Sequence, residues 1–447
     1  MTDLDERPSR VADVAEALRQ FPKSRALWEE ASRYLPGGIP GSSGGFLPVY
    51  FERSAGEYTW DVDGNRYLDM VSGMNALPVG SSLPEVRDAI VAQAEAGYYV
   101  QAPFPQVIDL ARELCERWPS ADKVQFIESA TKAANLAVRL GRAFSGRDRF
   151  AKFVGGYHGV WDGALQGPSM RYTQNLRLPG NVLPGVPRSG VDEVVLLPWN
   201  EPEICARILN EQAAEVGTLI MEPVMGDGFL PPVPGFLQML RELCTELGIV
   251  LVFDEAITQT LAPGGAQERF GVVPDLTVIA KGAVGGGLPL AAVGGREEIV
   301  ALAQLRAKPP VPHGSTFATH ALTVAAGLAQ LRLMTPAFYA RLDALGDRLR
   351  TGIVGLAERE GWEELQVTGL GNVAALHWRR SPVVTYADHE DCDTGMVESF
   401  YGGLMREFCL SAGSKLRVSA SMTDDDIDGC LAALERVVKA RLAAGHR

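Results

Sequence analysis

The chain has 447 residues, a formal net charge of −13, and a composition that is 46% hydrophobic and 22% charged. These proportions are typical of a globular protein, and the length favours two lobes or one large domain with a smaller partner. The acidic balance and the lack of a Lys/Arg run exclude a typical nucleic-acid-binding protein, and no apolar stretch is long enough to predict a membrane span.

The first ten residues, MTDLDERPSR, are acidic and contain no apolar segment, so they do not predict a secretory signal. The six cysteines are scattered and form no C-x-x-C pair. They are expected to be reduced thiols, which predicts a cytoplasmic protein.

The N-terminal part has helical periodicity in VADVAEALRQF and RALWEEASRYL, followed by a glycine-rich loop, PGGIPGSSGGF, at residues 36–46. The next segment, residues 49–70, alternates in polarity and contains a D-G-N turn. This pattern predicts a β-hairpin or meander.

From about residue 75, short apolar runs such as KVQFIES, TLIMEPV, IVLVFDE and LTVIAKG alternate with amphipathic helical stretches. This rhythm predicts a mainly parallel sheet that is covered on both faces, with polar chemistry at the carboxyl ends of the strands.

After about residue 320 the pattern becomes α+β. It begins with one long helix over ALTVAAGLAQLRLM and FYARLDALGDRLRTGIVGLAERE, and the chain ends with a helix that Thr423 would cap. We therefore expect a large domain at residues 75–320 and a small domain at residues 321–447, with residues 1–74 packed against the small domain.

Lys281 is placed between an apolar run and three consecutive glycines in AKGAVGGGLP. Loss of hydration disfavours the charged form of such a lysine, and a neutral amine can form a Schiff base with an aldehyde. Upstream, Asp254 ends the apolar run VLVFDEA and could face the pyridine nitrogen of pyridoxal phosphate. The alternatives are a lysine that reaches into solvent and an acidic pair, Asp254 and Glu255, that caps a helix.

Two further stretches carry groups that suit the same cofactor. ESATKAAN places Ser129, Ala130 and Thr131 directly before a helix, where backbone amides and hydroxyls bind phosphate, although a simple N-cap is the alternative. GGYHG offers Tyr157 as a cover for an aromatic ring, with His158 beside it, although a tyrosine there can also serve packing alone.

The order S-x-T, Y-H-G, M-E-P-V, D-E, A-K-G-x-x-G-G-G-L-P and H-G-S-T resembles the class III aminotransferases of fold type I, from about Pro36 to about Asp428. SGRDRFAKFVGGYHG and GAQERFGVVPDLTVIAKGAVGGGLPLAAVGGR are most similar to glutamate-1-semialdehyde aminomutases and their relatives. The resemblance implies an α/β, fold type I PLP-dependent transferase, with a mainly parallel seven-stranded sheet in the large domain and a smaller α+β domain. The implied cofactor is pyridoxal 5'-phosphate (PLP).

The resemblance also implies roles for single residues. Lys281 would form the aldimine and carry protons, Asp254 would face the pyridine nitrogen, and Tyr157 and Ile257 would cover the two faces of the ring. The remaining implied contacts to the cofactor or its phosphate are Ser129, Ala130, Thr131, His158, Glu222 and, from the neighbouring subunit, Thr316. The last of these implies a homodimer with shared active sites.

Several positions depart from the family pattern and bear on the substrate. The chain reads S-A-T-K-A where S-G-T-E-A is usual, so Lys132 replaces an acid. Residues 36–46 contain no arginine, whereas the aminomutases carry one in this loop, which argues against glutamate-1-semialdehyde itself as the substrate. Ser42 and Ser43 of this loop and Arg417, which resembles a carboxylate-binding arginine, are candidate substrate contacts; a surface arginine is the alternative for Arg417.

The sequence therefore predicts an aminotransferase that moves an amino group between a small amine or amino acid and an oxo acid or aldehyde. An aminomutase or an amino-acid racemase or epimerase on the same fold is the alternative, because fold does not determine the reaction. A non-catalytic cofactor-binding homologue is a third class, and the joint presence of Lys281, Asp254 and Tyr157 argues against it. The expected partners are small molecules and a second subunit, without nucleic acid, membrane or metal.

Overall fold

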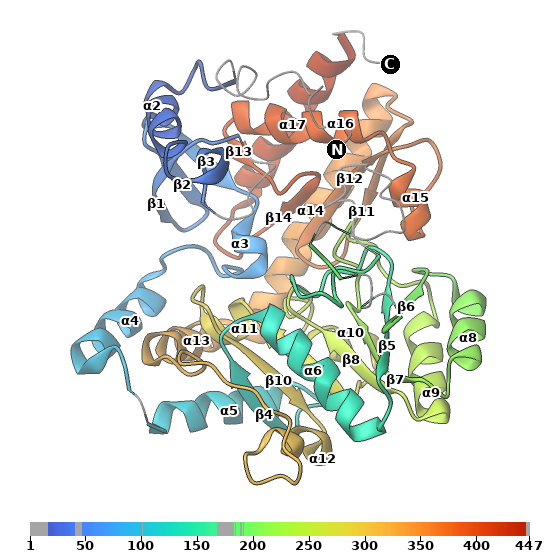
Figure 1. Ribbon diagram of the computed structural model, residues 1–447. Coiled ribbons are helices and arrows are strands. Elements are labelled where there is room, and N and C mark those ends of the chain that lie inside the picture. The colour runs from blue at the N-terminus through green and yellow to red at the C-terminus, as the bar shows by residue number, and fades with distance from the viewer. Residues whose placement is uncertain are drawn as a thin grey trace.

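The computed structural model describes residues 17–40, 47–100, 102–167, 183, 185–187, 190 and 192–443. Its lower half in Figure 1 holds a large sheet with helices on its faces, and its upper half holds two smaller sheets with the C-terminal helices. Ser42 and Ser43 lie outside the described residues.

The large sheet has seven strands in the order β4-β10-β9-β8-β7-β5-β6. In that order their bounds are Lys123–Ile127, Ala291–Gly295, Leu276–Ala280, Val250–Asp254, Val216–Met221, Arg149–Phe153 and Val194–Leu197. Strand β10 is antiparallel to both of its neighbours, and the other pairs are parallel. Every residue of β7, β8 and β9 is buried, as expected for central strands covered on both faces. The predicted mainly parallel, seven-stranded sheet is confirmed.

Helical elements accompany this sheet throughout, and four of them, at residues 84–97, 105–117, 130–145 and 236–247, follow the predicted amphipathic stretches. Their bounds are α4 (Pro84–Gly97), α5 (Pro105–Arg117), α6 (Ala130–Ser145), α8 (Pro202–Glu211), α9 (Phe236–Leu247), α10 (Gly265–Phe270), α11 (Gly282–Gly285), α12 (Glu297–Val300) and the 3₁₀ turn η4 (Ala301–Ala303). Helix α6 crosses in front of the sheet in Figure 1 and packs on β7 and β9. Strand β6 and helix α8 were not among the predicted elements.

Strands β1 (Phe51–Ala55), β2 (Tyr58–Asp61) and β3 (Arg66–Asp69) form the predicted antiparallel meander. A late strand, β13 (Cys409–Leu410), extends this sheet by pairing in parallel with β3, so that Cys409 lies opposite Leu68. The meander and the C-terminal part of the chain therefore share one sheet. The domain boundaries at residues 74 and 320 stay a prediction.

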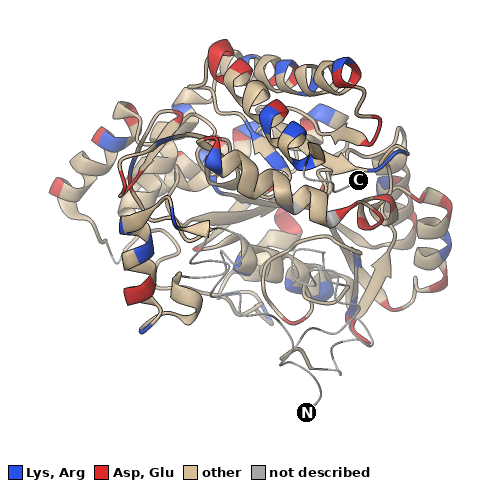
Figure 2. Ribbon diagram, turned by 90° about the horizontal axis from the view of Figure 1, so that it is seen from above, with Lys and Arg blue, Asp and Glu red and all other residues tan. Residues whose placement is uncertain are grey.

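The third sheet has the order β11-β12-β14, with bounds Leu365–Thr368, Val373–Trp378 and Lys415–Arg417. The remaining elements are α2 (Pro22–Ala31), η1 (Pro36–Gly38), α3 (Ser72–Asn75), α13 (Ala321–Leu333), α14 (Pro336–Glu360), α15 (Tyr386–Glu390), α16 (Thr394–Arg406) and α17 (Asp424–Ala443). Seen from above, basic and acidic residues are mixed over this side of the molecule (Figure 2).

The prediction of one long helix after residue 320 is wrong, because α13 and α14 are separate helices that meet at 75°. The break has a local cause: Thr335 caps α14 by accepting from Phe338 N, and Pro336 has no amide hydrogen with which to continue α13. Among the described residues, no single helix meets the length and composition test for a membrane span, and only this bent pair meets it jointly. The predicted cap of the last helix is confirmed, since Thr423 Oγ1 accepts from Asp426 N at 3.3 Å.

Candidate active site

The strand register places Lys281 and the start of α6 at one edge of the large sheet. Ala291 of β10 lies opposite both Ala280 of β9 and Ile127 of β4. Because both of these strands run antiparallel to β10, they end at the same edge, and the residues that follow them leave the sheet together. Lys281 follows β9 directly, and Ser129 follows β4 as the N-cap of α6.

Asp254 ends β8, the strand beside β9, and lies opposite Val278. The turn that holds Tyr157 and His158 follows β5, and Glu222 follows β7. Side-chain contacts connect these three strand ends: His158 Nδ1 lies 3.0 Å from Asp254 Oδ2, and Tyr157 N donates to Glu222 Oε2 at 3.0 Å. The structure thus brings five separated motifs of the sequence to the carboxyl edge of one sheet, where open α/β sheets bind ligands.

Burial sets the protonation of the groups beside Asp254. Burial and, to a smaller extent, the nearby charge of Asp254 together raise the pKa of Glu222 to about 8, so Glu222 is protonated at neutral pH. Burial also lowers the pKa of His158 despite the opposing effect of Asp254, so this imidazole is neutral. The neighbours of Asp254 therefore add neither a second negative charge nor a compensating positive one.

Lys281 is held in an uncommon backbone conformation, with φ at 57° and ψ at −124°. For a residue other than glycine, such a conformation costs about 1–3 kcal/mol and persists only where the surroundings impose it. Gly282 is fixed by Gln330, whose Nε2 donates to Gly282 O at 2.7 Å, and Lys281 O accepts from Gly285 N at 2.8 Å. Lys281 is half-buried, so it is partly shielded from solvent.

The start of α6 combines a helix cap with a tight contact. Ser129 Oγ accepts from Lys132 N at 3.4 Å, so the capping interpretation describes this serine. Gly159, the glycine of Y-H-G, has φ at +87°, and a Cβ there would overlap with Thr131. The turn after β5 therefore lies directly against the start of α6. Lys132 forms an ion pair with Glu128, which gives a role to the lysine that replaces the family's acid.

Ile257 and Arg417 are connected through buried amides. Asn75 Nδ2 donates to Ile257 O at 2.7 Å, and Asn372 Nδ2 donates both to Asn75 Oδ1 and to Val418 O, at 3.0 Å each. This network ties the strand that ends at Arg417 to the segment that follows Asp254. Arg417 is only 3% exposed, so the alternative of a surface arginine is wrong.

Thr316 lies in the loop between η4 and α13. It is exposed, and its carbonyl accepts from the Tyr99 hydroxyl at 3.5 Å. The rings of Tyr99 and Phe317 are 6.3 Å apart in an edge-to-face arrangement.

Lys152, which was not among the predicted site residues, is fully buried in β5. Its Nζ donates to Ala164 O at 2.7 Å and to Gln166 O at 2.9 Å. Burial lowers its pKa to about 7, while the nearby Glu222 opposes this shift. Its position in the run FAKF was the only available signal, since a lysine between apolar strand residues must find buried acceptors. The amides of Asn75, Gln259 and Asn372 carried no signal in the sequence.

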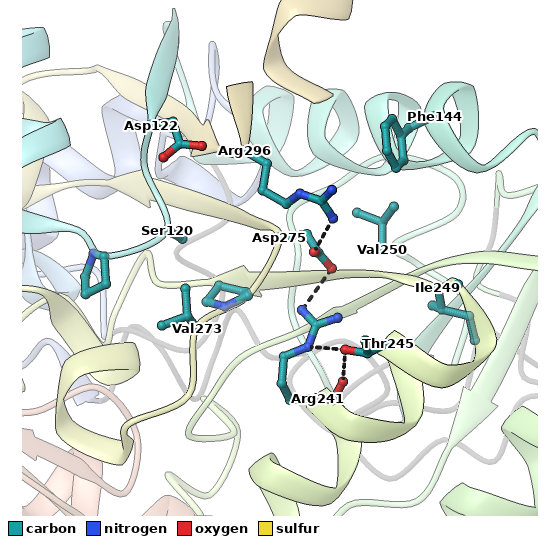
Figure 3. A pocket seen from close by; sticks show the side chains of 13 residues that line it. Ser120, Asp122, Phe144, Arg241, Thr245, Ile249, Val250, Val273, Asp275 and Arg296 are labelled. Atoms are coloured by element: carbon teal, nitrogen blue, oxygen red, sulfur yellow. Dashed lines mark hydrogen bonds and ion pairs between the residues drawn. The ribbon is translucent and has the colours of Figure 1, made fainter. Parts of the chain in front are cut away.

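A cavity of about 400 Å³ lies at the other edge of the same sheet (Figure 3). Asp275, just before β9, binds Arg241 at 2.9 Å and Arg296 at 3.0 Å, so these charges satisfy one another. Val250, the first residue of β8, also lines the cavity. The cavity is therefore at the amino ends of the strands, away from Lys281 and Asp254.

The groups at the carboxyl edge suit PLP. Lys281 offers an amine for its aldehyde, Asp254 a buried carboxylate for its ring nitrogen, and the start of α6 backbone amides for its phosphate. His158 Nε2 is buried and has no hydrogen-bond partner among the described residues, so a polar atom at this edge is left for a ligand or a water molecule.

Residues 41–438 match the family model described as Aminotransferase class-III. The chain therefore belongs to the class III aminotransferase family, and it has the fold type I architecture of that family. This confirms the resemblance seen in the sequence.

Individual relatives cover nearly the whole chain. A glutamate-1-semialdehyde 2,1-aminomutase of Desulforapulum autotrophicum is 36% identical over 428 residues, which are 93% of this chain and 98% of that relative. The crystal structure of an omega-transaminase from Sphaerobacter thermophilus has a TM-score of 0.87 at 32% identity and covers 94% of this chain and 99% of that one. A solved structure described as a transaminase with PLP bound has a TM-score of 0.86 at 28% identity, covering 95% and 99%.

Proposed function

We propose that this protein is a PLP-dependent aminotransferase that moves an amino group between a small amine or amino acid and an oxo acid or aldehyde. The observation that carries the proposal is the meeting of Lys281, Asp254 and the start of α6 at one sheet edge, which follows from the registers of β4, β8, β9 and β10. Membership of the class III family and the PLP-bound relative support it.

When bound, PLP supplies an aldehyde for the substrate amine and a ring that withdraws electrons from the substrate. Lys281 would bind the aldehyde carbon of the cofactor through Nζ. The released amine would take a proton from the substrate's α-carbon and deliver it to the former aldehyde carbon. One group within reach of both carbons can carry out this transfer as a general acid and base. The strained backbone of Lys281 would fix the starting point of that side chain.

The other residues would position the cofactor and hold protons. Asp254 would keep a proton on the pyridine nitrogen, and His158 would orient its carboxylate through the 3.0 Å contact. Glu222, as a neutral acid, would hold the Tyr157 turn through its bond to Tyr157 N. The contacts proposed for the two ring faces and the phosphate are Tyr157 and Ile257, and Ser129, Ala130 and Thr131.

Substrate recognition is proposed for Arg417 and for the loop that includes Ser42 and Ser43. The burial of Arg417 and its tether through Asn372 and Asn75 to Ile257 support a place beside the cofactor. A buried arginine suits the carboxylate of an amino acid.

The experiment is turnover by the purified, PLP-loaded protein against a panel of amines, amino acids and oxo acids. We expect turnover that requires both an amino donor and an oxo acid or aldehyde acceptor. An aminomutase, the alternative that the name of the Desulforapulum relative favours, would turn over a single substrate without added oxo acid. A racemase would invert its substrate without transfer. A spectral response to amines without any product would indicate a non-catalytic homologue.

We propose a homodimer in which Thr316 serves the neighbouring subunit's phosphate site. Exposed apolar side chains in the same region support an interface, namely Tyr98 at 65%, Leu305 at 87% and Phe317 at 55% exposed.

The test mixes Lys281→Ala with Thr316→Ala subunits under conditions that exchange partners. If Thr316 acts across the interface, mixed dimers hold one intact site and activity returns in part. Mixed dimers that form without any recovery would contradict the shared site.

We also propose that the protein acts in the cytoplasm. All six cysteines are free thiols in the structure, a state that reducing compartments maintain. Detection of the protein in a membrane or secreted fraction of its cells would contradict this.

A further inference from the structure

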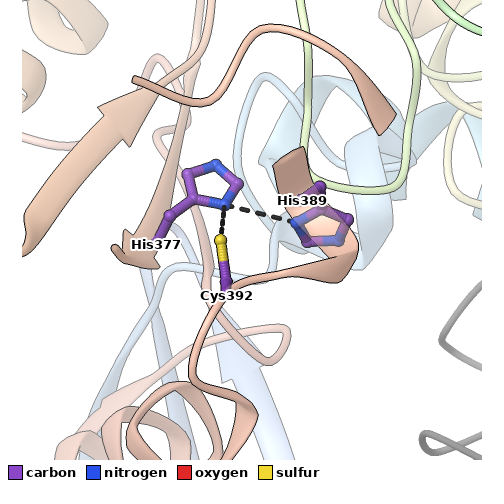
Figure 4. Close-up of side chains that lie close together, drawn as sticks. All are labelled: His377, His389 and Cys392. Carbon is purple, nitrogen blue, oxygen red and sulfur yellow. Dashed lines mark hydrogen bonds between the residues drawn. The ribbon is translucent and has the colours of Figure 1, made fainter. Parts of the chain in front are cut away.

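Three nitrogen and sulfur ligands meet in the interior, within the C-terminal part of the chain (Figure 4). His377 lies on β12, His389 lies in α15, and Cys392 follows α15 by two residues. The Nδ1 atoms of the two histidines are 3.3 Å apart, and Cys392 Sγ is 3.9 Å from His377 Nδ1. All three side chains are buried, and their ligand atoms lie within 4.8 Å of one another.

These separations fit one transition-metal ion. Zinc binds imidazole nitrogen at about 2.0–2.1 Å and thiolate sulfur at about 2.3 Å, so tetrahedral angles place such ligand atoms roughly 3.3–3.8 Å apart. The nitrogen–nitrogen separation of 3.3 Å and the nitrogen–sulfur separation of 3.9 Å are close to this range. An ion between the three atoms would draw them closer together, including the ligand atoms of His389 and Cys392, which lie within 4.8 Å of each other.

The outer polar contacts of both histidines direct lone pairs inward. Thr368 Oγ1 donates its single hydrogen to Gly228 O at 2.7 Å, so His377 Nε2, 2.7 Å from the same hydroxyl, must be the donor in that contact. His377 Nδ1 is then the acceptor nitrogen of a neutral ring.

His389 has a corresponding partner, since its Nε2 lies 3.6 Å from Asp227 Oδ1. A carboxylate there favours the proton on Nε2 and leaves a lone pair on Nδ1. Metal-binding histidines are usually oriented in this way, by a carboxylate or a backbone carbonyl behind the ring. Two lone pairs that face each other at 3.3 Å repel, and a cation between them removes the repulsion.

We propose that His377, His389 and Cys392 bind one divalent ion of the zinc class per chain, with a fourth position left to water. Two imidazoles and one thiolate are a donor set that zinc accepts and that magnesium and calcium do not favour.

The surroundings suggest a structural role for the ion. Asp227, behind His389, also accepts from Lys415 Nζ and Tyr386 Oη at 3.3 Å each. The Tyr386 ring in turn packs against Gly155, two residues before Tyr157. An ion that joins α15 to β12 would therefore stabilise the packing beneath the Tyr157 turn.

The test uses the PLP-loaded protein after removal of metals with a chelator. Cobalt(II) is added as a probe, because it occupies zinc sites and a thiolate ligand gives it intense absorption. We expect visible cobalt bands, at wavelengths longer than the cofactor's absorption, that saturate at one ion per chain and disappear on addition of zinc. Metal analysis after gel filtration with zinc should give the same stoichiometry, and zinc should raise the thermal midpoint.

Cys392→Ser and His389→Gln should lose the bands and most of the bound zinc. The matched control is Cys205→Ser, because Cys205 is also a buried thiol that donates to a carbonyl, Pro198 O at 3.1 Å, but has no histidine partner among the described contacts. It should retain both signals.

A wild-type protein that gives no thiolate–cobalt absorption would overturn the proposal, whether or not the variants fold. Equal zinc content in Cys392→Ser and wild type would also overturn it and would leave a hydrogen-bonded cluster in which His389 is doubly protonated.

Discussion

At the amino edge of the seven-stranded sheet, Asp275 lies between Arg241 and Arg296, whereas at the carboxyl edge Asp254 lies beside a neutral histidine and a protonated glutamate. Both aspartates are buried next to the central strands β8 and β9. The first has its charge satisfied within the protein, and the second is surrounded by groups whose pKa values are shifted by burial. The amino edge has a cavity, whereas the carboxyl edge has the clustered pKa shifts that are typical of functional sites.

The largest effect is expected from Lys281→Ala. It removes both the covalent attachment and the proton carrier, so turnover should fall by more than about 1,000-fold in steady-state assays, within the range that acid–base groups contribute. Borohydride should fix the cofactor to Lys281 in the wild type. The control is Lys439→Ala, a lysine on the exposed part of α17. A reduced adduct on any other lysine would refute the assignment.

Asp254→Asn should lower turnover by about 100-fold or more while the protein still binds PLP. A neutral amide cannot hold the proton on the pyridine nitrogen, whereas the contacts proposed between the start of α6 and the phosphate should be unaltered. Absorbance of the bound cofactor and steady-state rates measured on the same sample separate the two properties. Unchanged turnover would show that Asp254 has only a structural role.

Asp275→Asn tests the amino edge of the seven-stranded sheet. It removes the charge between Arg241 and Arg296, and the loss of these partly buried ion pairs should cost about 1–3 kcal/mol of unfolding free energy, measured with denaturant. Turnover per folded molecule should be nearly unchanged. A large loss of turnover in fully folded protein would show that the two edges are not independent.

The smallest effect is expected from Glu222→Gln, as a change in pH dependence. The pKa of Glu222 is raised from 4.5 to about 8 on folding, so the folded protein keeps a proton that the unfolded chain releases. Stability should therefore fall as pH rises from about 4.5 to about 8. Glutamine is neutral throughout, so thermal midpoints of the variant should fall less over this interval. Parallel curves for both proteins would contradict the raised pKa.

The sequence was sufficient to predict the sheet because β7, β8 and β9 are mainly apolar, and polar residues at their carboxyl ends indicated the edge where we propose the site. It was not sufficient where distant residues decide the outcome. The burial of Arg417 depends on strand pairing with Val373, and the acceptors of Lys152 come from a non-regular segment. His377, His389 and Cys392 meet only through the packing of α15 on β12. The break before α14 is different, because Thr335 and Pro336 are a local sequence signal for the start of a new helix.

The pairing of β3 with β13 has a consequence for biosynthesis. Leu68 emerges from the ribosome long before Cys409, so the free edge of β3 has no partner strand while most of the protein is being made. Such long-range pairing forms slowly, because closing the large intervening loop costs conformational entropy before the strand contacts can stabilise the chain. The large sheet draws all of its strands from residues 123–295 and can form earlier. Truncated chains that end before β13 should thus expose an unpaired strand edge, which is the kind of surface that aggregates and that chaperones protect.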